Sequence, residues 1–161
     1  AAQYEVLFEK LYRLSQRVSF TVKITEGQHY RRYVMQQAGL LPGRLPGDAG
    51  PAREIKRGGH PGGIGMSTKV VNAGNGFCFV DHVGDVYPSG FLPLVAGTVR
   101  QQGIAEVYRK HPLFKELRDY SRLEGKCGRC EYRDVCAGSR SRAYAVHGDY
   151  LAEEPFCILE R

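Results

Sequence analysis

The sequence of 161 residues contains no apolar run close to the roughly 20 residues that a membrane-spanning helix requires. It also shows no signal peptide and no other mark of secretion, and its five cysteines are an odd number. These absences argue against a membrane protein and against a disulfide-stabilised secreted domain. We therefore expect a cytoplasmic protein whose thiols stay free in a reducing environment.

Signatures of nucleic-acid recognition are missing as well. The net charge of +6 and the pI near 9.1 would suit an anionic partner. The basic residues are scattered, however, and no helix-turn-helix, finger or RNA-binding motif accompanies them. Direct binding of nucleic acid is therefore not expected. The apolar share of 42% and the charged share of 25% are ordinary for a globular protein of one domain or slightly more.

What the chain does have is a group of cysteines in its last quarter. Cys127, Cys130 and Cys136 are spaced Cys-x2-Cys-x5-Cys, and Cys157 follows near the end. Four thiolates suit a soft-metal centre, which is either a tetrahedral zinc or an iron–sulfur cluster. The spacing alone supports the two equally.

The residues around the cysteines favour a cluster slightly. A four-thiolate cluster carries net negative charge, which nearby cations and hydrogen-bond donors stabilise. A solvated helix face is the commoner role of such a charge run, so the basic residues do not decide the question. They are Lys126, Arg129, Arg133, Arg140 and Arg142.

Two other functions compete with a cluster domain. A closed four-cysteine zinc site would make the chain a structural or interaction module. A redox or regulatory protein could instead use the thiols of Cys127 and Cys130. Thioredoxin-type Cys-x2-Cys sites follow a strand and open a helix, however, whereas this one follows the charged run 118–122.

The first part of the chain predicts helix, strand and helix. Residues 3–16 place apolar side chains on one stripe, as an amphipathic helix does. Residues 18–25 alternate apolar and polar side chains, which indicates a strand. Residues 29–38 predict a second short helix. Such a piece of an α/β layer cannot close a sheet alone.

Residues 39–69 form a linker or mobile loop in this interpretation. The stretch from Gly39 to Gly65 holds half of the prolines and is too poor in apolar residues to fold by itself.

The pattern of the remaining residues predicts small elements. Residues 77–80 and 85–88 flank a turn that ends in Gly84, which is typical of a β-hairpin. Short helices are expected over 103–110 and 112–118, the second begun by a proline. A last helix is expected from about residue 135 to 146. The first three cysteines would then lie in a loop entering that helix, and the tail would bring Cys157 back to them.

These motifs in this order resemble the SPASM domain of radical S-adenosylmethionine enzymes. The resemblance covers residues 70–161 and is carried by Gly84-Asp85-Val86-Tyr87-Pro88, the Cys-x2-Cys-x5-Cys spacing and the terminal cysteine. In that family the domain follows the catalytic barrel and usually holds two auxiliary [4Fe–4S] clusters. The set for the second cluster is intact, so the resemblance implies one [4Fe–4S] cluster held by four ligands. They are Cys127, Cys130, Cys136 and Cys157.

The departures from the family pattern concern the first auxiliary cluster. Three of the family's cysteine positions hold Asn72, or a residue close to it, Ser89 and Arg140. The first cluster is therefore expected to be absent. The fifth cysteine, Cys78, matches no ligand position. An aerobic preparation could hold zinc in the same cage or leave the cysteines empty, because clusters decay in air and a thiolate set binds zinc well.

The N-terminal part is similar to the last strand and helix of a radical-enzyme partial barrel, on residues 20–26 and 29–32. The whole pattern also resembles family members with a single auxiliary cluster, among them those near the alternative haem biosynthesis decarboxylases. The expected fold is therefore α+β: a β-hairpin and short helices around a four-cysteine centre, preceded by a strand–helix remnant of an α/β barrel. The expected domains are residues 1–38 (barrel remnant), 39–69 (linker) and 70–161 (cluster domain).

The resemblance also sets limits. The family's radical chemistry needs a Cys-x3-Cys-x2-Cys loop, and the chain has no such spacing. Because it also begins with Ala1-Ala2 directly before a helix, we expect a C-terminal fragment that does not cleave S-adenosylmethionine alone and holds no catalytic residue. S-adenosylmethionine and a second [4Fe–4S] cluster would bind in the N-terminal part. The expected partners are the chain's own barrel domain and an electron-donor protein. The substrate stays open among tetrapyrroles, peptides and small metabolites.

Overall fold

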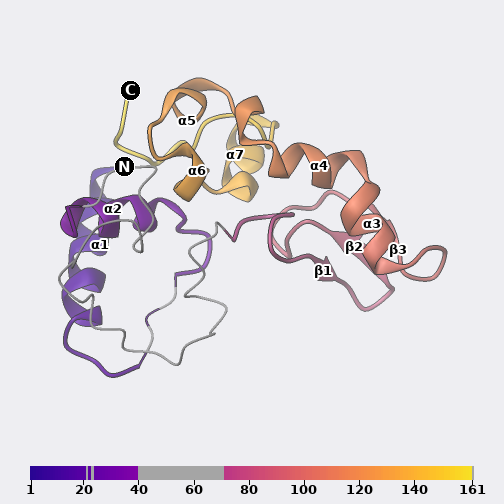
Figure 1. The fold of residues 1–161 in the computed structure, drawn as a ribbon, viewed down its shortest axis with the longest axis horizontal. Helices are drawn as coiled ribbons and strands as arrows, with labels where there is room; N and C mark the ends of the chain where they lie inside the picture. Colours follow the sequence, from indigo (N-terminus) through magenta and orange to yellow (C-terminus); the bar gives the residue numbers. More distant parts are fainter. Residues whose placement is uncertain (21, 23, 40–70, 161) are drawn as a thin grey trace, which may run out of the picture.

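The computed structural model describes residues 1–20, 22, 24–39 and 71–160. The described part combines several helices with one small antiparallel sheet, so its class is α+β. Figure 1 shows three regions: a helix pair from the N-terminal part, a sheet with two helices, and a group of short helices between them. The predicted linker, residues 39–69, lies almost entirely outside the described residues.

The helix pair consists of α1 (Ala2–Ser15) and α2 (His29–Gln37), close to the predicted ranges. The completely buried Phe8 of α1 packs against the rings of α2. A buried ion pair between Arg32 of α2 and Glu5 of α1 joins the two helices. The helix α2 also contacts α6 of the central group, which brings the N-terminal part against the cysteine region.

The predicted strand over residues 18–25 is not found in the described residues of this segment, since residues 21 and 23 lie outside them. Where this segment is described, it forms bends and irregular backbone. The alternating pattern predicts a strand only where another strand supplies hydrogen-bond partners. The described residues offer this segment no such partner.

The sheet is built on the predicted hairpin. Strand β1 (Phe79–Val80) pairs antiparallel with β2 (Asp85–Tyr87), and β2 pairs with β3 (Gly97–Thr98). The carboxylate of Asp81 accepts hydrogen bonds from the N–H groups of Val83 and Asp85, at 3.0 and 2.9 Å. Gly84 takes a φ of 96°, which closes the turn. The turn residues therefore explain why the hairpin could be predicted.

Two helices cover the sheet region and carry the main core. They are α3 (Ile104–Lys110) and α4 (Pro112–Arg118). Proline at the first position of α4 and the His111 side chain as its N-terminal cap define the break between them. The core around the sheet consists of Ala73, Val86, Leu92, Ala96, Val107, Leu113, Phe114 and Leu117.

The central group follows the 3₁₀ helix η1 (Tyr120–Arg122) and contains α5 (Gly125–Arg129), α6 (Arg133–Cys136) and α7 (Arg140–His147). The prediction of one helix over residues 135–146 is therefore wrong, because α6 and α7 are separate helices. Ala137 and Gly138 have φ values of 55° and 60°, and this left-handed turn ends α6 and redirects the chain into α7. None of the helices in the described part of the chain combines the length and apolar character that a membrane crossing requires.

Candidate metal centre

The cysteines lie on short elements rather than in one loop. Cys127 lies in α5 and Cys130 caps its end, while Cys136 is the last residue of α6. Cys157 comes from the segment after α7. The prediction that the first three cysteines occupy a loop entering a helix is therefore wrong, because the residues around them form two helical turns of their own.

Local packing fixes the Cys-x2-Cys segment. A Cβ added at Gly128 would lie 2.1 Å from the carbonyl oxygen of Leu123, so only glycine fits between the two cysteines. The N–H of Gly128 donates to the carbonyl of Glu124 at 3.0 Å, which closes the α5 turn. The sequence thus uses a glycine where the backbone folds back on itself.

All four predicted ligands line one cavity. It encloses about 380 Å³ of space free of atoms, part of it open to solvent. The lining also includes residues from α2, namely His29 and Arg32. The other lining residues are Lys126, Tyr132, Arg133, Ala137, Gly138, Glu154 and Leu159, besides the predicted ligands Cys127, Cys130, Cys136 and Cys157.

Backbone N–H groups donate to three of the four sulfurs. Such N–H···S bonds stabilise a thiolate and tune the metal that it binds. A buried side chain, Arg140, adds a fourth donor, with its Nη2 at 3.8 Å from Cys127 Sγ. The backbone bonds run from Glu154 to Cys127 at 3.2 Å, from Tyr132 to Cys130 at 3.3 Å and from Gly138 to Cys136 at 3.5 Å.

Three of the four thiols have a raised pKa and so favour the neutral form when no metal is bound. Burial raises the pKa of Cys136 to about 12, and burial also raises the pKa of Cys127 and of Cys130. A metal that binds here must therefore displace protons from buried thiols. The surrounding N–H groups and cations would offset the negative charge that results.

The donor set and its surroundings fit a thiolate-bound group. Four cysteines, N–H donors on their sulfurs and cationic side chains meet at one cavity. In the described part of the chain, no three His, Cys, Asp or Glu side chains stand close enough together to hold a metal ion as they are. The shared cavity, rather than ligand-like distances, is thus the observation that connects the four cysteines.

Cys78 lies apart from this cavity. It precedes β1, is partly buried and packs against the core of the sheet region. Burial raises its pKa. The structure therefore gives it a packing role, consistent with its lack of a ligand position in the sequence.

The three positions where the family pattern would have further cysteines are all buried. Asn72 is 1% exposed, Ser89 2% and Arg140 0%. The Asn72 amide donates to the carbonyl oxygen of Gly138 at 2.7 Å, so the segment before the hairpin touches the turn that precedes Arg140. Hydrogen-bonding side chains thus occupy these interior positions.

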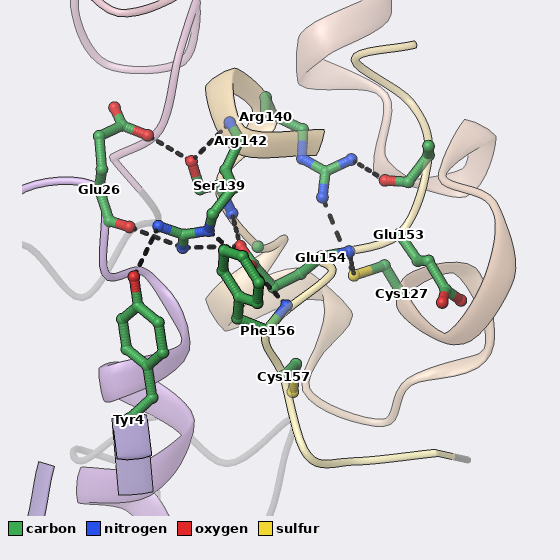
Figure 2. A network of polar contacts seen from close by, with 12 residues as sticks. Tyr4, Glu26, Cys127, Ser139, Arg140, Arg142, Glu153, Glu154, Phe156 and Cys157 are labelled. Carbon is green, nitrogen blue, oxygen red and sulfur yellow. Dashed lines mark hydrogen bonds and ion pairs between the residues drawn. The ribbon is translucent and has the colours of Figure 1, made fainter. Parts of the chain in front are cut away.

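Sequence analysis did not identify His29, Arg32 or Glu154 as residues of the site. The first two are more than 90 residues away from the cysteines along the chain, and no local pattern connects them. Glu154 is completely buried and forms an ion pair with Arg142, whose Nε lies 2.7 Å from Glu154 Oε1. Figure 2 shows how this pair links the cysteine region to Tyr4 and Glu26 of the N-terminal part.

Comparison with known proteins finds relatives along almost the whole chain. The AdoMet-dependent heme synthase of Methanosarcina barkeri is 41% identical over 157 residues, which are 98% of this chain and 42% of that protein. The AdoMet-dependent heme synthase of Nitratidesulfovibrio vulgaris is 37% identical over 159 residues, 98% of this chain and 40% of that protein. The pre-heme d1 synthase of Dinoroseobacter shibae is 37% identical over 91 residues, 54% of this chain and 22% of that protein.

These relatives are radical S-adenosylmethionine enzymes, and the chain matches them as a fragment of that family would. It spans about two fifths of the length of the heme synthases that it matches. No protein-family model matches the chain. The resemblance deduced from the cysteine pattern is thus confirmed at the level of the radical enzymes.

Proposed function

We propose that this chain is the auxiliary-cluster part of a radical S-adenosylmethionine enzyme. Cys127, Cys130, Cys136 and Cys157 would hold one [4Fe–4S] cluster. The observation that carries this proposal is the single cavity lined by all four cysteines, with N–H donors on three of the sulfurs. The similarity to radical enzymes over 98% of the chain supports it independently.

A bound [4Fe–4S] cluster would supply one-electron redox chemistry at this site. With four protein thiolates the ligand set is complete, which favours electron transfer or structural support over direct binding of substrate. The chain's own residues hold the thiolates in place: the α5 turn orients Cys127 and Cys130, and the turn at Ala137–Gly138 directs an N–H at Cys136. The tail returns Cys157, and Lys126 Nζ donates to its carbonyl oxygen at 2.9 Å.

For the whole protein we propose AdoMet-dependent heme synthesis, because the relatives that match 98% of the chain bear that name. A tetrapyrrole substrate follows from this proposal. S-adenosylmethionine and its own [4Fe–4S] cluster would then bind in a barrel domain outside this chain. An electron-donor protein would deliver electrons to the enzyme. A reducing, cytoplasmic setting suits the five free cysteines.

Anaerobic reconstitution of the chain with iron and sulfide tests the cluster. We expect about four irons and four sulfides per chain and a brown protein. Serine at Cys127, Cys130, Cys136 or Cys157 should each lower the iron content. The matched control is Cys78→Ser, which removes a thiol from the sheet core and should leave the iron content unchanged.

Two results would contradict the assignment. Loss of the cluster in Cys78→Ser alone would show that the ligand set is wrong. Zinc bound after strictly anaerobic reconstitution with excess iron and sulfide would instead favour the four-cysteine zinc module. Zinc found in aerobically prepared protein would not, because thiolate sets also bind zinc well once a cluster is lost.

A further inference from the structure

Arg140, the first residue of α7, is a positive charge enclosed by the protein. Its side chain is 0% exposed and is one of the largest fully buried side chains. Its Nη1 donates to the carbonyl oxygens of Tyr150 and Ala152, at 2.9 and 2.7 Å. Its Nη2 lies 3.8 Å from Cys127 Sγ (Figure 2).

This guanidinium has no carboxylate partner within ion-pair distance among the residues that the structure describes. The carboxylate of Glu154 is close by, but it is held by Arg142 through Nε at 2.7 Å and Nη2 at 2.9 Å. The partners of Arg140 are thus two neutral carbonyls and one sulfur. A buried charge that is not directly paired with an opposite charge is costly, and an anion at the sulfur side of the guanidinium would offset that cost.

The packing around Nη2 leaves little freedom for the guanidinium to move. A Cβ added at Gly138, whose φ is 60°, would lie 2.7 Å from Arg140 Nη2 and 3.4 Å from Cys127 Sγ. A side chain at residue 138 would therefore crowd the guanidinium where it approaches the sulfur. The carbonyl oxygens of Tyr150 and Ala152 hold the other terminal nitrogen of the guanidinium, Nη1.

We propose that Arg140 is a positioning residue that compensates the negative charge of the cluster and thereby raises its reduction potential. The inference rests on the proposed function, since it assumes a cluster on the thiolate of Cys127. Reduction adds one electron and no proton, so the reduced cluster is more negative than the oxidised one. A fixed cation at the ligand sulfur stabilises the reduced form more than the oxidised form, because charges interact strongly away from water.

The residue also explains one departure from the family pattern. At a position where that pattern has a cysteine ligand of another cluster, this chain carries a cation that faces Cys127 of the remaining ligand set. Where the family pattern has a cysteine that binds a cluster directly, Arg140 would act on the cluster indirectly, through Cys127.

Spectroelectrochemical titration of the anaerobically loaded chain tests the proposal, with an electrode and a mediator dye as the one-electron donor. Arg140→Gln keeps hydrogen-bond donors and removes the charge. We expect its equilibrium constant for reduction to fall at least tenfold, which is a midpoint potential about 59 mV lower. Arg140→Lys keeps the charge but has fewer hydrogen-bond donors. Its midpoint potential should therefore lie between those of the wild type and Arg140→Gln. The control Lys110→Gln removes an exposed charge from α3 and should titrate like the wild type.

The iron and sulfide content separates this proposal from the proposed function. A wild-type chain that binds no cluster would overturn both. A fully loaded Arg140→Gln with the wild-type potential would overturn only the role of Arg140.

A measurement on the wild type covers the case in which Arg140→Gln does not fold. In protein labelled with ¹⁵N-arginine, pulsed electron paramagnetic resonance of the reduced cluster should detect a weak coupling to a guanidinium nitrogen. The coupling that comes from Arg140 should disappear in Arg140→Lys, while any coupling to Arg32 or Arg133, which also line the cavity, should persist. Its absence in the wild type would overturn the contact on which the proposal depends.

Discussion

Replacing His29 by phenylalanine should remove an acid sensitivity from the folded chain. His29 begins α2, is 0% exposed and has no hydrogen-bond partner on either ring nitrogen in the described part of the structure. Its ring packs against those of Tyr4 and Phe8, with centroids 4.9 and 4.6 Å away. A phenyl ring suits these contacts and leaves no polar atom without a partner.

The magnitude follows from the pKa of His29, which burial lowers from 6.5 to about 4. Above pH 6.5 the imidazole is neutral in the folded and the unfolded chain and contributes no pH dependence. Between pH 6.5 and 4 only the unfolded chain takes up the proton, so stability falls with pH by about 2 kcal/mol at pH 5 and roughly 3 kcal/mol below pH 4. The charged groups around the ring act in both directions: Glu154 and Glu5 raise the pKa, whereas Arg142 and Arg32 lower it.

Urea unfolding of the metal-free chain at pH 7.5 and 5.0, followed by circular dichroism, measures this difference. Between pH 7.5 and 5.0 the free energy of unfolding should fall by about 2 kcal/mol more in the wild type than in His29→Phe. His147→Gln, which changes an exposed histidine on α7, should keep the full loss. An equal loss in His29→Phe and the wild type would refute the reasoning, as would an NMR titration of the His29 ring near its ordinary pKa.

Two further predictions concern buried hydrogen bonds beside the site. Glu154→Gln should lower the free energy of unfolding by about 3 kcal/mol, because it removes one charge of the buried pair with Arg142; an unchanged urea midpoint would show that the pair contributes no net stability. Asn72→Ala should cost about 1–3 kcal/mol, because it leaves the buried carbonyl of Gly138 without its amide donor at 2.7 Å. Hydrogen exchange should then rise first around residues 136–139, and unchanged protection there would contradict this contact.

Local signals explain which elements the sequence could predict. The helices α1, α2, α3 and α4 follow apolar periodicity or a proline start, and the hairpin follows its turn residues. Strand β3 was missed because its two residues, Gly97 and Thr98, are too few to form a pattern. The break between α6 and α7 was missed because alanine is a strong helix former, yet Ala137 takes a left-handed backbone with a φ of 55°.

Of the residues that line the candidate site, the sequence singles out mainly the four cysteines. Spacing groups Cys127, Cys130 and Cys136, and the family pattern adds Cys157. The buried charges that surround them have no such signature, since Arg140 reads in the sequence like any residue of a basic helix face. Its burial and its contact with a sulfur exist only in the folded chain.

The same limit applies to the boundary of the site. The resemblance to a cluster domain begins at residue 70, yet His29 and Arg32 of α2 line the cysteine cavity. Arg142 of α7 donates to the carbonyl of Glu26 at 2.9 Å, and Ser139 donates to the carboxylate of the same residue (Figure 2). A group bound by the cysteines would therefore touch both parts of the chain at once. Loss of that group should loosen α2 as well as the tail. A cluster enclosed by residues 70–161 alone would not have this effect on α2.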